Sequence, residues 1–198
     1  ARRPDLEKFA EKHKIKIGTI VDLIHYRIAN EHTVTKVSSA KMETKFGEFD
    51  VHTYKDSISG SLHLAFTRGE ITADKPLMVR VHIPNTVRDI CEVYNSSRTS
   101  WSFGDALKKI AEEGNGVAVL LSGEDYGQSM EQNIASILTD GSEANQTNRG
   151  GSDLTIGTGS QILRDLGVGK MRLLSFPAKF NAISGFDLEV VEFVAFEK

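Results

Sequence analysis

The sequence predicts an α+β fold with a helical N-terminal appendage, and three changes of pattern along the chain indicate it. Over the first thirty or so residues, apolar positions recur at helical spacing. From Val34 to Ile83 apolar and polar residues instead alternate, as they do in strands of a sheet with one buried face. After Trp101 helical and strand patterns follow one another, which adds an α/β character to the second half.

The appendage is expected to consist of two helices. Pro4 and Asp5 begin the first, over residues 4–14, because proline and an acidic residue are favoured in a first helical turn. Thr19 is a suitable N-cap for the second, over residues 20–31. The expected apolar stripes are Leu6, Phe9 and Ala10 on the first helix and Ile20, Leu23, Ile24 and Ile28 on the second.

Four runs of alternating residues follow and predict antiparallel strands at 35–42, 47–55, 61–67 and 77–83. Turn-forming residues separate the later runs, in "SISGS" and in "TADKP". The second half begins with a helix over 103–113 that Gly114 ends. The remaining expected elements are a buried strand at 116–122, helices at 129–140, 160–167 and 178–184, and strands at 171–176 and 188–196.

Composition narrows the class of protein. The chain has 198 residues, with 24 basic against 27 acidic side chains, and no basic cluster that would follow a nucleic-acid backbone. It has one cysteine, so an internal disulfide is impossible, and no apolar run is long enough for a membrane span or a signal peptide. We therefore expect a cytoplasmic protein without nucleic-acid or membrane partners. The chain opens on Ala1, which leads us to expect a piece of a longer protein.

Taken alone, the residues do not form a catalytic set. Cys91 has Arg88, Asp89 and Glu92 nearby and no base, so a buried thiol is the expected state. The six histidines are scattered, and the three that fall in strands are expected to be half-buried and hydrogen-bonded; these are His52, His63 and His82. The glycine-bearing stretch "GGSDLTIGTGSQIL" offers backbone N–H groups to an anion at a helix start, but it lacks the lysine of a phosphate loop.

Two segments resemble known families. "ARRPDLEKFAEKHKIKIGTIVDLIHYR" is similar to the end of the 3,4-dihydroxy-2-butanone 4-phosphate synthase domain of bifunctional riboflavin-biosynthesis proteins. "TKFGEFDVHTYKD", "PLMVRVHI", "SEAN" and "QILRDLGVGKMRLLSFPAK" resemble, in this order, the GTP cyclohydrolase II domain that follows in those proteins. The resemblance implies a synthase terminal segment at 1–32 and a cyclohydrolase-II-like domain at 33–198, with a mixed sheet and helices.

The resemblance also implies that a zinc site is lost. In the family, "SECLTGDVFGSLRCDCG" follows "RVH", and its three cysteines hold the zinc that activates water. Here "RVH" is kept as Arg80 to His82, but the first zinc cysteine falls on Asn85 and the cysteine pair is absent. An amide and hydroxyls do not replace thiolates as zinc ligands. No cofactor is expected in this chain, and magnesium is expected in the synthase domain that it lacks.

Other family residues are also replaced. The arginine of the family's "YLRQEGRGIGL" loop falls on Tyr126, while the loop glutamate is kept as Glu124. The family's aspartate proton acceptor falls on Asp153 or, in another alignment, on Ser152, and the nucleophilic arginine falls on Thr155 or Leu154. The nearest survivors of the nucleotide contacts are Arg80, His82, Glu124, Ser175 and Lys179.

Three hypotheses follow from the resemblance. The first is a catalytically silent cyclohydrolase-II-like domain of a butanone-phosphate synthase, kept for regulation or as a scaffold. The second is a module that still binds GTP or another phosphorylated ligand through Arg80, Glu124, Ser175 and Lys179. The third is an active GTP cyclohydrolase II with an altered, zinc-independent site. Both parent domains resemble homodimers, so a homodimer is expected.

Overall fold

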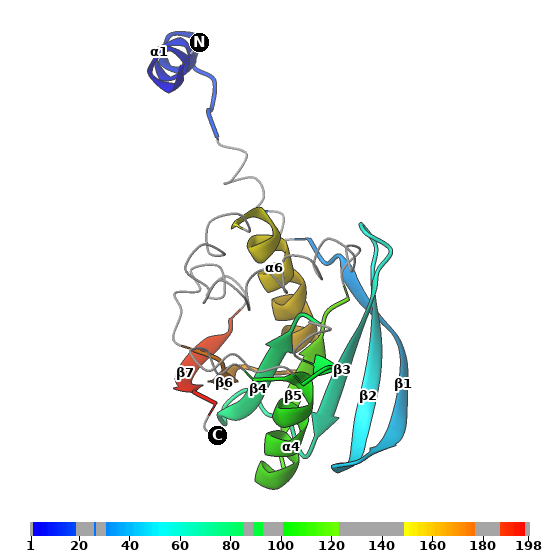
Figure 1. Ribbon diagram of the computed structural model, residues 1–198. Coiled ribbons are helices and arrows are strands. Elements are labelled where there is room, and N and C mark those ends of the chain that lie inside the picture. Colours follow the sequence, from blue (N-terminus) through cyan, green and yellow to red (C-terminus); the bar gives the residue numbers. More distant parts are fainter. Residues whose placement is uncertain are drawn as a thin grey trace. The chain divides into compact units, whose positions relative to one another are not determined.

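The chain forms two compact units, Ala1–Glu31 and His32–Lys198. Figure 1 shows the computed structural model, which describes residues 2–18, 26, 31–84, 89–92, 101–122, 149–176 and 187–196. For residues 149–155 the description is limited to the helical backbone. The expected helices at 129–140 and 178–184, and all of the one at 20–31 except Tyr26 and Glu31, lie outside these ranges.

The first unit contains helix α1, Arg3–His13, which confirms the helix expected there. Its start is fixed by Pro4 in the first turn and by a hydrogen bond from the Arg2 amide to the Asp5 carboxylate at 3.1 Å. Lys14 ends the helix in the left-handed conformation, with a φ of 53°.

The second unit is built on a seven-stranded sheet with the order β1-β2-β3-β5-β4-β6-β7 (Figure 1). The first three strands form antiparallel pairs, and β5 is antiparallel to β3. From β5 onward the strands β4, β6 and β7 are parallel to their neighbours. The strands are β1 Val34–Thr44, β2 Gly47–Asp56, β3 Leu62–Arg68, β4 Leu77–His82, β5 Gly116–Leu120, β6 Lys170–Leu174 and β7 Glu189–Val194.

The position of β4 in the sheet differs from the prediction, which made it the fourth of four antiparallel strands. It does not pair with β3, because β5 lies between them, and β4 is parallel to both of its neighbours. Leu77, Met78 and Val79 are all buried, so both faces of this strand are covered. A strand that is buried on both faces belongs in the interior of a sheet with helices on each side.

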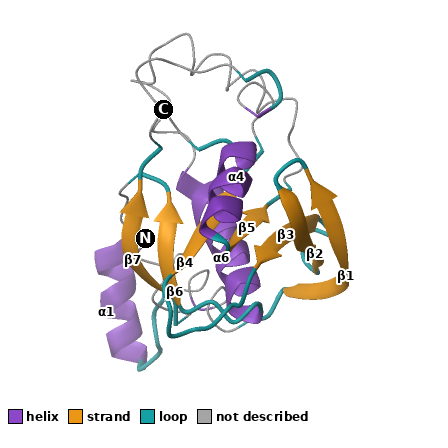
Figure 2. Ribbon diagram, turned by 90° about the horizontal axis from the view of Figure 1, so that it is seen from below, coloured by secondary structure: helices purple, strands orange, loops and turns teal. Residues whose placement is uncertain are grey.

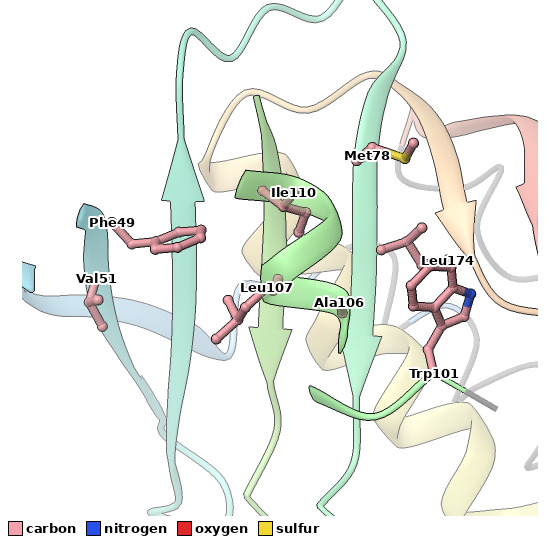
Figure 3. Close-up of a cluster of buried hydrophobic side chains, with 9 residues drawn as sticks. Phe49, Val51, Met78, Trp101, Ala106, Leu107, Ile110 and Leu174 are labelled. Carbon is pink, nitrogen blue, oxygen red and sulfur yellow. The ribbon is translucent and has the colours of Figure 1, made fainter. Parts of the chain in front are cut away.

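Helix α4, Phe103–Glu113, covers one face of the sheet. Ser102 caps its start by accepting the Asp105 amide at 3.0 Å, and Gly114 ends it with a φ of 83°, as predicted. Figure 3 shows the apolar cluster that the helix buries together with side chains of β2, β4 and β6. The cluster contains Phe49, Val51, Met78, Trp101, Ala106, Leu107, Ile110, Ala118 and Leu174.

Helix α6, Arg149–Asp165 (Figure 2), packs on the other face, where Gly159 approaches Val81 of β4. The predicted start of this helix at Ser160 is wrong, because the glycine-bearing stretch before it is itself helical. The packing explains why residue 159 is a glycine, because a Cβ there would lie 2.8 Å from Cγ1 of Val81. Glycine lowers helix propensity but permits this close approach to the sheet. No helix in the described part of the chain combines the length and apolarity of a membrane span.

Candidate functional site

The predicted site residues Arg80 and His82 lie at the carboxyl end of β4, on the sheet face that α4 covers. Residues of β4 alternate between the faces, so both side chains point the same way as buried Met78. The neighbouring parallel strands β5 and β6 also end here. In open sheets with parallel strands, ligands commonly bind at this end.

The Arg80 guanidinium joins three segments of the chain. It donates from Nη1 to the Leu174 carbonyl at 2.7 Å and from Nη2 to the Trp101 carbonyl at 3.2 Å. It also donates from Nε to Nδ1 of His82, at 3.3 Å. Arg80 thus holds the end of β6 and the residue before the cap of α4 against β4.

His82 is fully buried, and its bonding pattern determines its tautomer. A guanidinium only donates hydrogen bonds, so Nδ1 of His82 must accept from Arg80. The ring proton is therefore on Nε2, which donates to Oδ2 of Asp89 at 2.7 Å. The imidazole also lies 5.5 Å, centroid to centroid, from the ring of Phe103.

Asp89 completes the network. Its Oδ2 accepts from His82, and its Oδ1 accepts the amide of Phe103, the first residue of α4, at 3.3 Å. An acidic group is favoured at this position because the first N–H groups of a helix have no partner within it. The chain of contacts runs from Arg80 through the buried His82 to Asp89 and α4, and we call it the Arg80–His82–Asp89 network.

Sequence reasoning did not include Asp89, which was considered only as a neighbour of Cys91. Its role depends on the path of the loop after β4, and no local pattern in the sequence predicts that path. Cys91 itself is exposed, so the expectation of a buried thiol is wrong. It follows an exposed residue, Ile90, in a turn on the surface instead of lying in an element of the core.

The donors in the described part of the chain do not fit zinc. No three His, Cys, Asp or Glu side chains converge there as metal ligands would. The chain's one cysteine is on the surface, and Asn85 lies outside the described residues. His82, the buried histidine nearest to that position, already has both ring nitrogens in hydrogen bonds. Three thiolates cannot come from one cysteine, so no step is assigned to this metal.

The structure brings together two of the predicted ligand contacts, Arg80 and His82. Ser175 directly follows β6 and lies next to the carbonyl that Arg80 binds. Glu124, Tyr126 and Lys179 lie outside the described residues. Ser152, Asp153, Leu154 and Thr155 fall in the first turns of α6, where the description is limited to the backbone.

A second histidine, His63 at the start of β3, contacts the residues that follow β5. Nδ1 of His63 accepts the Ser122 amide at 3.1 Å, while its Nε2 is buried and has no hydrogen-bond partner among the described residues. Burial lowers the pKa of His63, which keeps the ring neutral. The expectation of hydrogen-bonded strand histidines is confirmed for His52, His63 and His82, which lie in β2, β3 and β4. Half-burial is confirmed only for His52, because His63 and His82 are buried.

Comparison with known proteins gives consistent results. Residues 35–195 match the family described as GTP cyclohydrolase II. The chain is 48% identical, over its full length, to the 3,4-dihydroxy-2-butanone 4-phosphate synthase of Pseudomonas aeruginosa, of which it covers 53%. It is 42% identical to the riboflavin biosynthesis protein RibBA of Aquifex aeolicus, with 97% of this chain and 49% of that protein covered.

A solved structure is also similar over the whole chain. It is RibBX, a two-domain 3,4-dihydroxy-2-butanone 4-phosphate synthase from A. baumannii, with a TM-score of 0.68 and 40% identity. The comparison covers 100% of this chain and 50% of that one. The chain therefore spans about half the length of the relatives that it matches.

Proposed function

The chain belongs to the GTP cyclohydrolase II family, and from this membership we propose that it is a catalytically silent member with a regulatory or scaffolding role. In this proposal it is one domain of a 3,4-dihydroxy-2-butanone 4-phosphate synthase of riboflavin biosynthesis. Relatives with that name are similar to the chain along its whole length and continue well beyond it, which supports the assignment.

The observation that carries the proposal is the internal use of the Arg80–His82–Asp89 network. Arg80 is bound to two main-chain carbonyls and to His82, and His82 is bound to Asp89 at 2.7 Å. These contacts fix the ends of β4 and β6 and the start of α4. Groups at a catalytic centre must instead present donors or acceptors to the substrate.

The cysteine content supports the same conclusion. Family chemistry requires a metal-activated water, and the three thiolates that hold the metal in the family cannot be supplied by the single, exposed Cys91. Two arginines of the family fall on Tyr126 and on Leu154 or Thr155. None of these side chains carries the positive charge of an arginine.

Metal analysis and a GTP turnover assay on the same preparation test the proposal. We expect no stoichiometric zinc and no formation of the ring-opened product above a no-enzyme blank, with an authentic GTP cyclohydrolase II as positive control. Turnover without zinc would support an active enzyme with an altered site. Turnover together with one zinc per chain would show that the assignment of Asn85 is wrong.

A second candidate function is a sensor for GTP or another phosphorylated ligand. The position of Arg80, His82 and Ser175 at the carboxyl ends of parallel strands favours it, since this is the usual ligand-binding edge. Calorimetric titration with GTP and with ribulose 5-phosphate decides between this function and a scaffold. Glu124→Gln and Lys179→Ala are the matched variants, because both residues are retained from the family's nucleotide contacts.

We also propose that the protein is a homodimer. Leu6 and Phe9 of α1 are 45% and 54% exposed, which is a large apolar area for a short helix to leave in water. Light scattering on the full chain and on a form that begins at His32 tests this. The shorter form keeps the hydrogen bonds of Thr33 to Gln161 that anchor the start of β1. Strictly monomeric behaviour of both forms would refute the proposal.

A further inference from the structure

A row of hydrogen bonds crosses three strands on the sheet face opposite α4. Oγ of Ser39 in β1 lies 2.8 Å from Nδ1 of His52 in β2. Nε2 of the same ring lies 3.1 Å from Oγ1 of Thr67 in β3. Tyr54, two residues along from His52, binds Asp165 of α6, so this row faces α6 and not the Arg80–His82–Asp89 network.

The direction of each hydrogen bond in the row is determined. Thr67 donates its hydroxyl proton to the main-chain carbonyl of Asp50, at 3.2 Å, because a carbonyl can only accept. Oγ1 of Thr67 must then accept from His52, which places the ring proton on Nε2. The lone pair of Nδ1 therefore faces Ser39, whose hydroxyl donates to it.

The surroundings keep His52 in this form while leaving Ser39 accessible. Thr67 is buried, His52 is half-buried and Ser39 is exposed. Partial burial, and next the positive charge of Lys36, lower the pKa of His52 and keep the imidazole neutral at neutral pH.

The charged groups that face this ring come from three elements. Lys36 on β1 and Asp165 on α6 pair with each other at 3.3 Å. Asp50 on β2, and after it Asp165, raise the pKa of His52 and so partly oppose the two lowering effects. Lys41, the next residue along β1 on the same face as Ser39, pairs with Glu48 at 2.8 Å.

The arrangement contains the parts that activate a hydroxyl. A serine is a weak nucleophile until a neighbouring base within about 2.6–3.2 Å takes its proton, and the base works best when a third group fixes its orientation. His52 is such a base for Ser39, and Thr67 is the group that orients it. Ser38, the preceding residue of β1, pairs with Thr53 and points to the opposite face of the sheet, away from His52.

We propose that Ser39 is a covalent modification site that accepts acyl groups from activated esters, with His52 as its general base. Oγ of Ser39 attacks the carbonyl carbon of the ester, and the hydroxyl proton passes to Nδ1 of His52. The bond from that carbon to the leaving oxygen breaks, and the leaving group departs as an anion. The imidazolium then releases its proton to solvent, which leaves O-acyl-Ser39.

The test uses the full chain with 4-nitrophenyl acetate as the probe. Trypsin releases residues 37–41 as one peptide, and fragmentation in the mass spectrometer separates acetylation of Ser38 from that of Ser39. We expect Ser39 to be acetylated at least about tenfold faster than Ser38, which is less than the roughly 10²- to 10⁴-fold typical of general-base catalysis because the site is open to water. Replacement His52→Gln should lower the Ser39 rate to that of Ser38.

A pH profile of the unmodified protein provides a measurement that needs no variant. The rate of acetylation of Ser39 should fall as the pH drops and His52 gains a proton. The rate of acetylation of Ser38 should not show this fall. Equal rates at the two serines, an unchanged Ser39 rate in a folded His52→Gln variant, or the absence of this fall at Ser39 would each overturn the proposal. None of these outcomes depends on whether the domain binds or converts GTP.

Discussion

Replacement of Asp89 by asparagine tests whether the Arg80–His82–Asp89 network holds the fold. Asparagine has one carbonyl oxygen where aspartate has two acceptors, so either Nε2 of His82 or the amide of Phe103 loses its partner. The bond to His82 is short and its ring is fully buried, while the bond to Phe103 is longer, at 3.3 Å. A hydrogen bond to a charged group contributes about 1.5–3 kcal/mol, and a neutral one about 1 kcal/mol.

We therefore expect Asp89→Asn to lower the free energy of unfolding by about 1–2 kcal/mol. Asp89→Ala removes both acceptors and should cost about 2–4 kcal/mol. Urea unfolding followed by tryptophan fluorescence measures this, because Trp101 is the only tryptophan and its carbonyl accepts from Arg80.

The matched control is Glu92→Gln, which makes the same change of charge in the same loop on an exposed side chain. The free energy of unfolding of this variant should stay within about 0.5 kcal/mol of that of the original protein. If Asp89→Asn and Glu92→Gln have the same effect, the network does not stabilise the fold, and the scaffold interpretation of Arg80 and His82 fails.

Three further predictions concern α6 and the second histidine site. Tyr54→Phe removes the 2.6 Å hydrogen bond to Asp165 and should cost about 1.5 kcal/mol in urea unfolding, the low end for a charged acceptor because Asp165 is half-exposed. Gly159→Ala should cost about 1–3 kcal/mol, since the new Cβ meets stiff Val81, and Val81→Ala in the same chain should recover part of the loss. The pKa of His63 is lowered in the folded state, so the folded protein binds fewer protons and the free energy of unfolding should fall as the pH drops below about 6.5; His63→Gln should reduce this fall.

The elements that the sequence predicted well are those whose pattern is local. Alternating residues of β1, β2 and β3 pair in sequence order, and α4 spans the predicted residues and ends at Gly114 as predicted. The order of the parallel strands was not predictable in this way. Whether β3 is followed in space by β4 or by β5 depends on contacts between residues far apart in the chain.

The start of α6 was missed because two properties of glycine act in opposite directions. Repeated glycines lower the helix propensity of the stretch before Ser160, so the predicted helix begins only at Ser160. In the folded chain Gly159 meets Val81, and the lack of a side chain allows the helix to approach the sheet. Tertiary packing decides such a case, and the sequence of the helix alone does not contain its partner.

The site was predicted in part. Resemblance to the family identified Arg80 and His82, and the structure places them together. Asp89 joins them through a loop contact with His82, seven residues away, that no helical or strand period predicts. The Ser39–His52–Thr67 row was missed for a related reason, because it requires the register of three strands and not the pattern of one.

The contacts of Arg80 also set a limit on the sensor hypothesis. To bind a phosphate, its guanidinium must give up the carbonyls of Leu174 and Trp101, which together contribute about 3–6 kcal/mol. At 1.4 kcal/mol per factor of ten, binding through Arg80 is weakened by roughly 10²- to 10⁴-fold relative to a free guanidinium. Micromolar binding of GTP would then have to use other residues. Arg80→Lys should therefore lower the free energy of unfolding far more than it weakens the binding of GTP. If this variant instead unfolds like the original protein and loses measurable GTP binding in the same calorimetric titration, Arg80 is a ligand contact, and the scaffold assignment of the network is wrong.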